Sequence, residues 1–172
     1  MIRKAELKDL DGINYLLYQV HKVHADGRPD YFIPDTKKYT DEGLKKLIQD
    51  GIDGCESRKA AGYKETAENP IYVYVDENGM IAGHAFCIFE INEGNHSVYP
   101  RRNLYIDDIC VDSDHRRQGI GEALYEYVLQ VAKENECDSI TLNVWELNPG
   151  AKAFYEKCGL KPLKTVMEQR LS

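Results

Sequence analysis

The central stretch of this chain, residues 109–131, couples a short strand to a strong amphipathic helix through two arginines and two glycines. The strand ends in Ile-Cys-Val, and the turn reads Asp-Ser-Asp-His-Arg-Arg-Gln-Gly-Ile-Gly. Apolar residues then recur at helical spacing, with charged residues on the opposite face. Their positions are Ile120, Leu124, Tyr127, Val128 and Val131. A strand, a glycine-rich turn and a helix in this order predict an α/β protein.

The turn has the properties of an anion-binding site. The first N–H groups of a helix lack intrahelical partners and lie at the positive end of the helix dipole, so they stabilise a phosphate. Gly119 and Gly121 have no Cβ and let the backbone approach phosphate oxygens. Arg116 and Arg117 add positive charge for a pyrophosphate or a further phosphate on the same ligand.

Two common phosphate-binding motifs that contain similar glycines do not match this turn. The dinucleotide-binding fingerprint requires a third glycine where this chain has Leu124, and the P-loop requires a Gly-Lys-Ser/Thr sequence that is missing here. A Gly-x-Gly can also be only a tight connection between a strand and a helix. The turn alone therefore predicts anion binding without deciding the ligand.

The rest of the chain reads as one domain spanning residues 1–172, because its length suits a single domain and no linker or repeat interrupts it. Asp9 and Thr40 are predicted to precede helices, and Asn78-Gly79 predicts a tight hairpin turn. The other elements are predicted from periodicity and β-propensity. They are strands at residues 2–6, 71–75, 80–91, 104–111, 139–145 and 164–171, and a short helix at residues 148–158.

Composition and charge limit the partners and the cellular location that we expect. The net charge of −7 disfavours a nucleic-acid partner, and no stretch approaches the roughly 18 apolar residues of a membrane span. The start of the chain lacks the apolar core of a signal peptide, so we expect a cytoplasmic protein. Five cysteines without a Cys-x-x-Cys pair predict free thiols and no metal site.

Two motifs together resemble the GNAT superfamily of N-acetyltransferases. The sequence R-x-x-G-x-G at residues 116–121 is similar to the family's Gln/Arg-x-x-Gly-x-Gly/Ala signature. The sequence N-x-x-A-x-x-F-Y-x-x-x-G-L at residues 148–160 is similar to a later family segment, with Leu160 in place of the usual Phe. The resemblance covers residues 102–171 in detail, and the N-terminal half only in the order of its elements.

The resemblance implies a fold, a reaction and a ligand. The GNAT fold is an α/β fold with a mixed, largely antiparallel and splayed sheet of about six or seven strands, flanked by helices. The implied reaction is direct transfer of an acetyl group from acetyl-CoA to a primary amine, without a covalent enzyme intermediate or a metal. Family members also form dimers through exposed final strands, so a homodimer is a further expectation.

The resemblance also assigns residues to acetyl-CoA. The pyrophosphate would contact the main chain of the turn, while pantetheine would pair with a strand whose Ile109 N–H polarises the acetyl carbonyl. Asn148 would contact the cofactor, and the residues themselves also predict it as a helix N-cap ahead of Pro149. The implied cofactor-binding residues are Ile109, Val111, Arg116, Arg117, Gln118, Gly119, Ile120, Gly121 and Asn148.

Two residues are candidates for the chemistry. By resemblance, Tyr155 would protonate the leaving thiolate, although an aromatic residue at this spacing also fits simple helix packing. Asp107 is the candidate general base, because strand alternation places it on one face with Ile109 and Val111, and directs Asp108 to the other face. The alternative for Asp107 is a carboxylate that binds the acceptor ammonium.

Other polar residues have weaker claims to a role in the chemistry. Alternation directs Cys110 away from the Ile109 face, which disfavours a cysteine nucleophile. His21 and His24 have a spacing that can hold a metal, but no third ligand is evident, and His84 and Glu90 are weaker candidates for the acceptor cleft.

A non-catalytic acyl-CoA-binding regulatory module is the alternative function. The sequence leaves open the acceptor amine, the acyl chain length and the general base.

Overall fold

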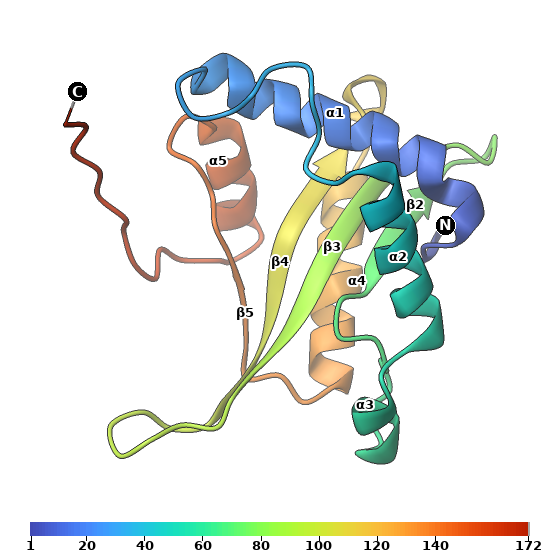
Figure 1. Cartoon of the computed structure of the whole chain (residues 1–172), viewed down its shortest axis with the longest axis vertical. Helices are drawn as coiled ribbons and strands as arrows, with labels where there is room; N and C mark the ends of the chain where they lie inside the picture. Colours follow the sequence, from blue (N-terminus) through green and yellow to red (C-terminus); the bar gives the residue numbers. More distant parts are fainter. Residues whose placement is uncertain (172) are drawn as a thin grey trace.

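The structure, a computed structural model, describes residues 1–171. The strands of these residues form a single sheet in the order β1-β2-β3-β4-β5, with helices on both faces (Figure 1). The strands are β1 (Ile2–Lys4), β2 (Ile71–Val75), β3 (Ile81–Asn92), β4 (Arg101–Val111) and β5 (Ser139–Leu142). The helices are α1 (Leu10–Gly27), α2 (Asp41–Asp53), α3 (Glu56–Ala60), α4 (Ile120–Glu134) and α5 (Pro149–Lys157).

The sheet is mixed and largely antiparallel, as expected. The first four strands pair antiparallel as a meander, and β5 joins β4 in parallel after the α4 crossover. A parallel neighbour requires such a crossover connection. The expected sheet of six or seven strands is too large, since residues 1–171 contain five.

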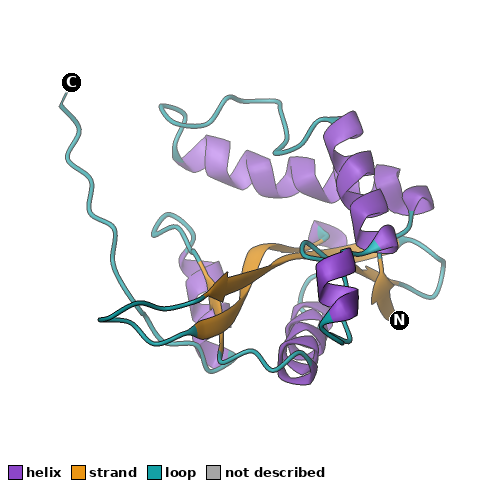
Figure 2. Cartoon of the chain, turned by 60° about the horizontal axis from the view of Figure 1, so that its bottom comes forward, coloured by secondary structure: helices purple, strands orange, loops and turns teal. Residues whose placement is uncertain are grey.

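The expected strand at residues 164–171 accounts for part of the difference in strand number. This segment is coil (Figure 2). Ion pairs of Glu168 with Arg28 and of Arg170 with Asp30 connect it to the residues after α1, and no strand of the described residues lies beside it. The apolar side chains of the segment are almost fully exposed, at 86% for both Val166 and Met167 and 90% for Leu171. Because β-propensity measures how a side chain packs against neighbouring strands, an alternating sequence without a neighbour does not form a strand.

The two faces of the sheet carry separate cores. On one face, α1 and α2 bury Ile13 and Leu44 against Phe86 of β3. On the other face, α4 buries Leu124 against Ala85 and its neighbours. The sheet is thus the middle layer between α1 and α2 on one side and α4 on the other (Figure 1).

The helix ends follow local chemistry. Thr40 caps α2 by accepting a hydrogen bond from the Gly43 N–H at 3.1 Å, and Asn148 caps α5 through the Ala151 N–H at 3.1 Å, so both predicted caps are confirmed. Asp9 precedes α1, but its carboxylate binds the Arg3 guanidinium and the Glu6 N–H instead of capping the helix.

Other boundaries differ by a few residues. The connector predicted at residues 56–70 contains the short helix α3, β4 begins at Arg101, three residues early, and β5 ends at Leu142, three residues early. Element ends are where a local pattern is weakest. Among the described residues, no helix combines the length and the apolar character needed to cross a bilayer.

Candidate active site

The site lies where β4 and β5 separate. Their parallel pairing ends at Ile106 and Leu142, while β4 continues to Val111, and the two segments diverge beyond this point (Figure 1). The last part of β4 therefore pairs on one side only, with β3.

The main chain of Ile109 and Val111 faces this gap. The Asp112 N–H donates to the Ala82 carbonyl at 3.0 Å, so these two residues form a hydrogen-bonded pair of the antiparallel ladder. Such pairs alternate with non-bonded ones, and Ile109 and Val111 stand opposite Ala85 and Gly83 in the non-bonded positions. Their N–H and C=O groups consequently point away from β3. The Val111 carbonyl accepts a hydrogen bond from Arg116, and the other groups are available to an extended ligand.

A β-bulge in β4 overturns one expectation from the sequence. Phe86 pairs with Asp108 and the next residue of β3 pairs with Ile106, so Asp107 is an extra residue in the ladder. Asp107 contacts the α1 and α2 side of the sheet, whereas Ile109 and Val111 pack with α4 on the other side. The alternation that grouped Asp107 with Ile109 and opposed it to Asp108 is wrong, because the bulge shifts the alternation by one residue.

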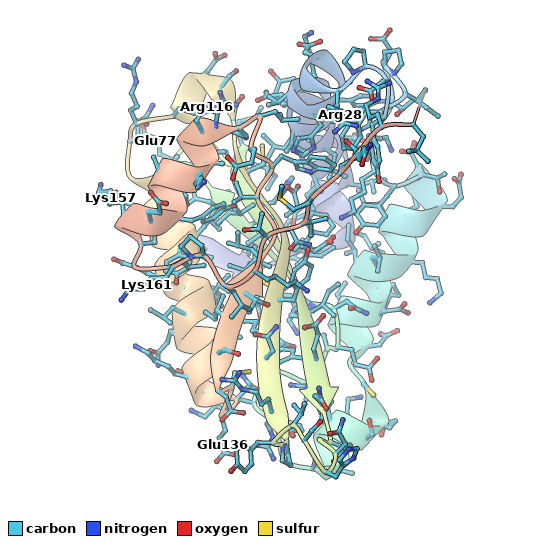
Figure 3. All side chains as sticks on the ribbon, turned by 90° about the vertical axis from the view of Figure 1, so that its left-hand side faces the viewer. Arg28, Glu77, Arg116, Glu136, Lys157 and Lys161 are labelled. Atoms are coloured by element: carbon cyan, nitrogen blue, oxygen red, sulfur yellow. The ribbon has the colours of Figure 1, made fainter. Side chains whose placement is uncertain are left out.

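The turn after β4 presents main-chain donors and arginines together. Arg117 and Gly119 both have left-handed backbone conformations, with φ of 61° and 80°, and α4 begins directly afterwards at Ile120. No side chain of the described residues caps this helix, so its first N–H groups are open to a ligand. Arg116 is exposed at the upper end of the molecule (Figure 3) and donates to the Val111 carbonyl at 3.3 Å.

Gln19 of α1 fixes the start of this turn. Its side-chain amide donates to Asp112 Oδ1 at 2.7 Å, and its carbonyl accepts the Ser113 N–H at 3.0 Å. The other oxygen of Asp112 binds His115 Nδ1 at 2.7 Å. Although burial opposes the shift, these hydrogen bonds lower the pKa of Asp112, while Asp112 raises the pKa of His115.

Helix α5 brings Tyr155 to the same gap. Burial raises the pKa of its phenol, and the negative charge of Asp108 adds to the increase. Tyr155 is partly buried, and its neighbour Phe154 closes over the first turn of α4, where a Cβ on Gly121 would lie 3.4 Å from the Phe154 ring. The motif at residues 148–160 is thereby held against the turn at residues 116–121.

On the opposite side of the gap, Asp107 already holds a cation. The Lys38 ammonium lies 2.6 Å from Asp107 Oδ2, and the Tyr39 hydroxyl donates to the same oxygen at 2.9 Å. Tyr39 stacks on Phe86 with ring centroids 5.6 Å apart. No local sequence pattern indicates Lys38 and Tyr39 as site residues, because only the folded chain brings the segment before α2 to β4.

Aromatic side chains connect α1 to the segment after β5. His24 stacks on Phe32, and Phe32 meets Trp145 edge to face with centroids 5.4 Å apart. Tyr31 also contacts Trp145. Burial lowers the pKa of His24. No local pattern in the sequence indicated that Trp145 would join these residues.

Cys110 lies on the α1 side of β4. Its thiol points to the Leu16 carbonyl, and burial raises its pKa to about 12. The side chain thus points away from the face of Ile109 and Val111, as expected, and its thiolate is strongly disfavoured.

The two halves of the site therefore have different characters. A main-chain edge and a helix N-terminus have the chemistry to bind an extended anion, and carboxylates and aromatic rings on the other side suit a cation. The fold is thus an α/β fold whose site combines an anion-binding end with a cation-binding side.

Comparison with known proteins gives the family. The model of the acetyltransferase (GNAT) family matches residues 28–160, and the chain belongs to this family of N-acetyltransferases. A solved structure of a BH1408 mutant from Bacillus halodurans has a TM-score of 0.87 and 27% identity, covering all of this chain and 99% of that one. Glucosamine-6-phosphate N-acetyltransferase from Arabidopsis thaliana shares the fold, with a TM-score of 0.66 and 24% identity.

Curated relatives are matched over shorter stretches. Thialysine N-epsilon-acetyltransferase from Bos taurus is 33% identical over 40% of this chain and 41% of its own length. A putative ribosomal protein bS18-alanine N-acetyltransferase from Bacillus subtilis is 26% identical over 60% of this chain and 64% of its own length. Streptothricin acetyltransferase from Streptomyces lavendulae is 30% identical over 73% of this chain and 57% of its own length. The match thus spans less than two thirds of each of these relatives.

Proposed function

We propose that this protein transfers the acetyl group of acetyl-CoA to a primary amine that is cationic in solution. The observation that carries the proposal is the free main-chain edge of Ile109 and Val111, which leads directly to the open N-terminus of α4. An extended ligand with amides at one end and a pyrophosphate at the other matches this edge and this helix end.

Each part of the cofactor has a counterpart in the chain. The N–H groups from Gln118 to Gly121 and the exposed side chains of Arg116 and Arg117 would hold the pyrophosphate. The edge of Ile109 and Val111 would pair with pantetheine amides and place the Ile109 N–H on the thioester carbonyl. Asn148 would contribute beside the gap, from the N-terminus of α5.

The chemistry follows from these positions. The N–H of Ile109 would stabilise the negative charge that develops on the carbonyl oxygen as the amine attacks. The C–S bond then breaks, and the Tyr155 hydroxyl would donate its proton to the leaving sulfur. Desolvation of Tyr155 keeps this phenol protonated until the thiolate forms.

The acceptor side supports a cationic amine. Asp107 holds the Lys38 ammonium at 2.6 Å, so this carboxylate accepts a primary ammonium in this geometry. We propose that the ammonium of an acceptor displaces Lys38 and that Asp107 binds it. Two of the relatives are named as acetyltransferases of thialysine and of streptothricin, whereas another is named for the alanine of a ribosomal protein.

The test measures free-thiol release from acetyl-CoA with a panel of lysine analogues, polyamines, aminoglycosides and N-terminal peptides, with products confirmed by mass. We expect at least one cationic amine to stimulate release, and Tyr155→Phe to lower kcat while acetyl-CoA binding persists. A protein that does not bind acetyl-CoA would contradict the proposal directly.

A non-catalytic acyl-CoA-binding module is the alternative. It would bind acetyl-CoA with the same edge and show no transfer to any amine of the panel. Tyr155 favours the enzyme, because a partly buried phenol beside the gap is unnecessary for binding alone.

We further propose a cytoplasmic homodimer. Five cysteines without a disulfide among the described residues fit a reducing compartment. The exposed apolar residues of the C-terminal segment, Leu163, Val166 and Met167, would pack on a second copy. Light scattering should give a dimer for the wild type and a monomer for the double variant Val166→Asp, Met167→Asp, and a monomeric wild type would refute this.

A further inference from the structure

A fully buried histidine lies directly behind the site. His84 of β3 has no exposed surface, and its Nε2 lies 2.6 Å from Asp108 Oδ2. Its Nδ1 is buried without a hydrogen-bond partner among the described residues. Because most buried polar atoms have partners, an unsatisfied ring nitrogen in the core requires a reason beyond stability.

Asp108 connects this histidine to the gap. The bulge places Asp108 on the same side of β4 as Asp107, and its side chain keeps 13% of its surface exposed. Its negative charge raises the pKa of Tyr155 and of Tyr39, and acts on His24 from across the site. Asp108 therefore lies among the groups that surround the acceptor.

The two adjacent carboxylates, Asp107 and Asp108, have different hydrogen-bond partners. One oxygen of Asp107 receives both the Lys38 ammonium and the Tyr39 hydroxyl, so Asp107 is neutralised by a cation. Asp108 has no hydrogen bond from a lysine or arginine among the described residues, and its hydrogen-bond partner is the imidazole of His84. Of the two carboxylates, Asp108 is therefore the one that holds no ammonium in this structure and is open to accept a proton from an acceptor.

We propose that Asp108 removes the proton from the acceptor ammonium and that His84 is the positioning residue that enables it to do so. The inference rests on the proposed function, and it assigns to Asp107 only the binding of the ammonium. It reverses the roles that strand alternation gives to the two carboxylates.

Atoms and protons balance in this scheme. The acceptor N–H bond breaks, the electron pair stays on nitrogen, and the proton binds a carboxylate oxygen of Asp108. The free amine attacks the thioester, and the C–S bond breaks. The sulfur takes the proton of the Tyr155 hydroxyl, and the second proton that leaves the acceptor nitrogen returns to Tyr155. An ammonium and a thioester thus give an amide, a thiol and one proton, which leaves through Asp108 to solvent.

Charged and titratable groups from several elements surround Asp108 and act on its pH dependence. His24 belongs to α1, Lys38 and Tyr39 to the segment before α2, and Tyr155 to α5. The neighbours within the sheet are His84, Tyr105, Asp107 and Cys110. Comparing variants of both carboxylates distinguishes an effect of these groups from an effect of the pair of Asp108 and His84.

The experiment measures kcat and KM from pH 5 to 9 for the wild type, Asp108→Asn, His84→Gln and the matched control Asp107→Asn, with the acceptor found in the panel. We expect Asp108→Asn to lower kcat by about 100-fold or more, the usual contribution of a general base. It should also remove the acidic limb of the pH profile, which is the fall of kcat toward low pH. His84→Gln keeps a donor to Asp108 and should move the limb to a different pH. Asp107→Asn should raise the KM of the acceptor and keep the limb.

Two outcomes overturn the inference. One is an Asp108→Asn variant that keeps its kcat and its acidic limb, and the other is a limb that is lost with Asp107→Asn instead. Acetyl-CoA binding by calorimetry, measured for each variant, confirms that the cofactor side is folded. If the wild type binds acetyl-CoA but acetylates no amine, the proposed function has failed. The inference then fails with it, whereas an active wild type whose Asp108→Asn variant keeps kcat and the acidic limb refutes the inference alone.

Discussion

Replacing Gly83 even by alanine should destabilise the protein, because β3, β4 and α4 meet at this residue. A Cβ at this position would lie 2.9 Å from Leu124 Cδ1, 3.0 Å from the Cys110 carbonyl oxygen and 3.3 Å from Ile120 Cγ2. The carbonyl belongs to the backbone of β4 and cannot rotate away. Overpacking of this kind costs about 1–3 kcal/mol, which lowers Tm by about 2–12 °C in a domain of this size.

The same substitution has a matched control in Gly51. A Cβ there would meet no atom within 4 Å, and Gly51 lies inside α2, so alanine should stabilise by about 0.4–1 kcal/mol and raise Tm by about 1–4 °C. Thermal unfolding followed by circular dichroism measures both variants. Gly83 also stands opposite Val111, so Gly83→Ala should reduce the rise in Tm that acetyl-CoA produces. A Gly83→Ala protein as stable as the wild type would refute the reasoning.

Three further predictions concern neighbouring elements. Leu124→Ala should cost about 2–5 kcal/mol and lower Tm by about 4–20 °C, because Leu124 is fully buried under β3. Thr40→Ala should cost about 1 kcal/mol in urea unfolding through loss of the bond to the Gly43 N–H, whereas Thr40→Ser should cost less. Asp112 raises the pKa of His115, so protonated His115 stabilises the folded state. This stabilisation is complete below the pKa of His115 in the unfolded chain, about 6.5, and is lost as pH rises through the higher pKa of His115 in the folded protein. The drop in Tm between pH 6 and 8 should therefore be smaller in His115→Asn than in the wild type.

The parts of the fold that follow from local sequence were predictable. The α4 helix, the Asn148 cap and the hairpin at Asn78 depend on periodicity, a side-chain acceptor and a turn dipeptide. The turn at residues 116–121 was also evident, because two glycines and two arginines before a helix are a local pattern. These features require no knowledge of what packs against them.

The acceptor half of the site could not be predicted in the same way. The bulge at Asp107 depends on how β4 pairs with β3, and no residue of β4 marks it, since bulges need not contain glycine. The contact of Lys38 with Asp107 joins residues 69 positions apart. The coil at residues 164–171 shows the converse, since its strand-like pattern lacks a neighbouring strand.

The bulge also explains how one strand could contact both of the proposed substrates. In a regular strand, a carboxylate two residues before Ile109 would share its face and point toward α4. The extra residue instead directs Asp107 and Asp108 toward α1 and α2, while Ile109 and Val111 pack on the α4 side and leave their main chain open to the gap. The carboxylates thereby lie away from the turn of residues 116–121, where their negative charge would repel a pyrophosphate. One inserted residue thus separates the site for a cation from the site for an anion along a single strand.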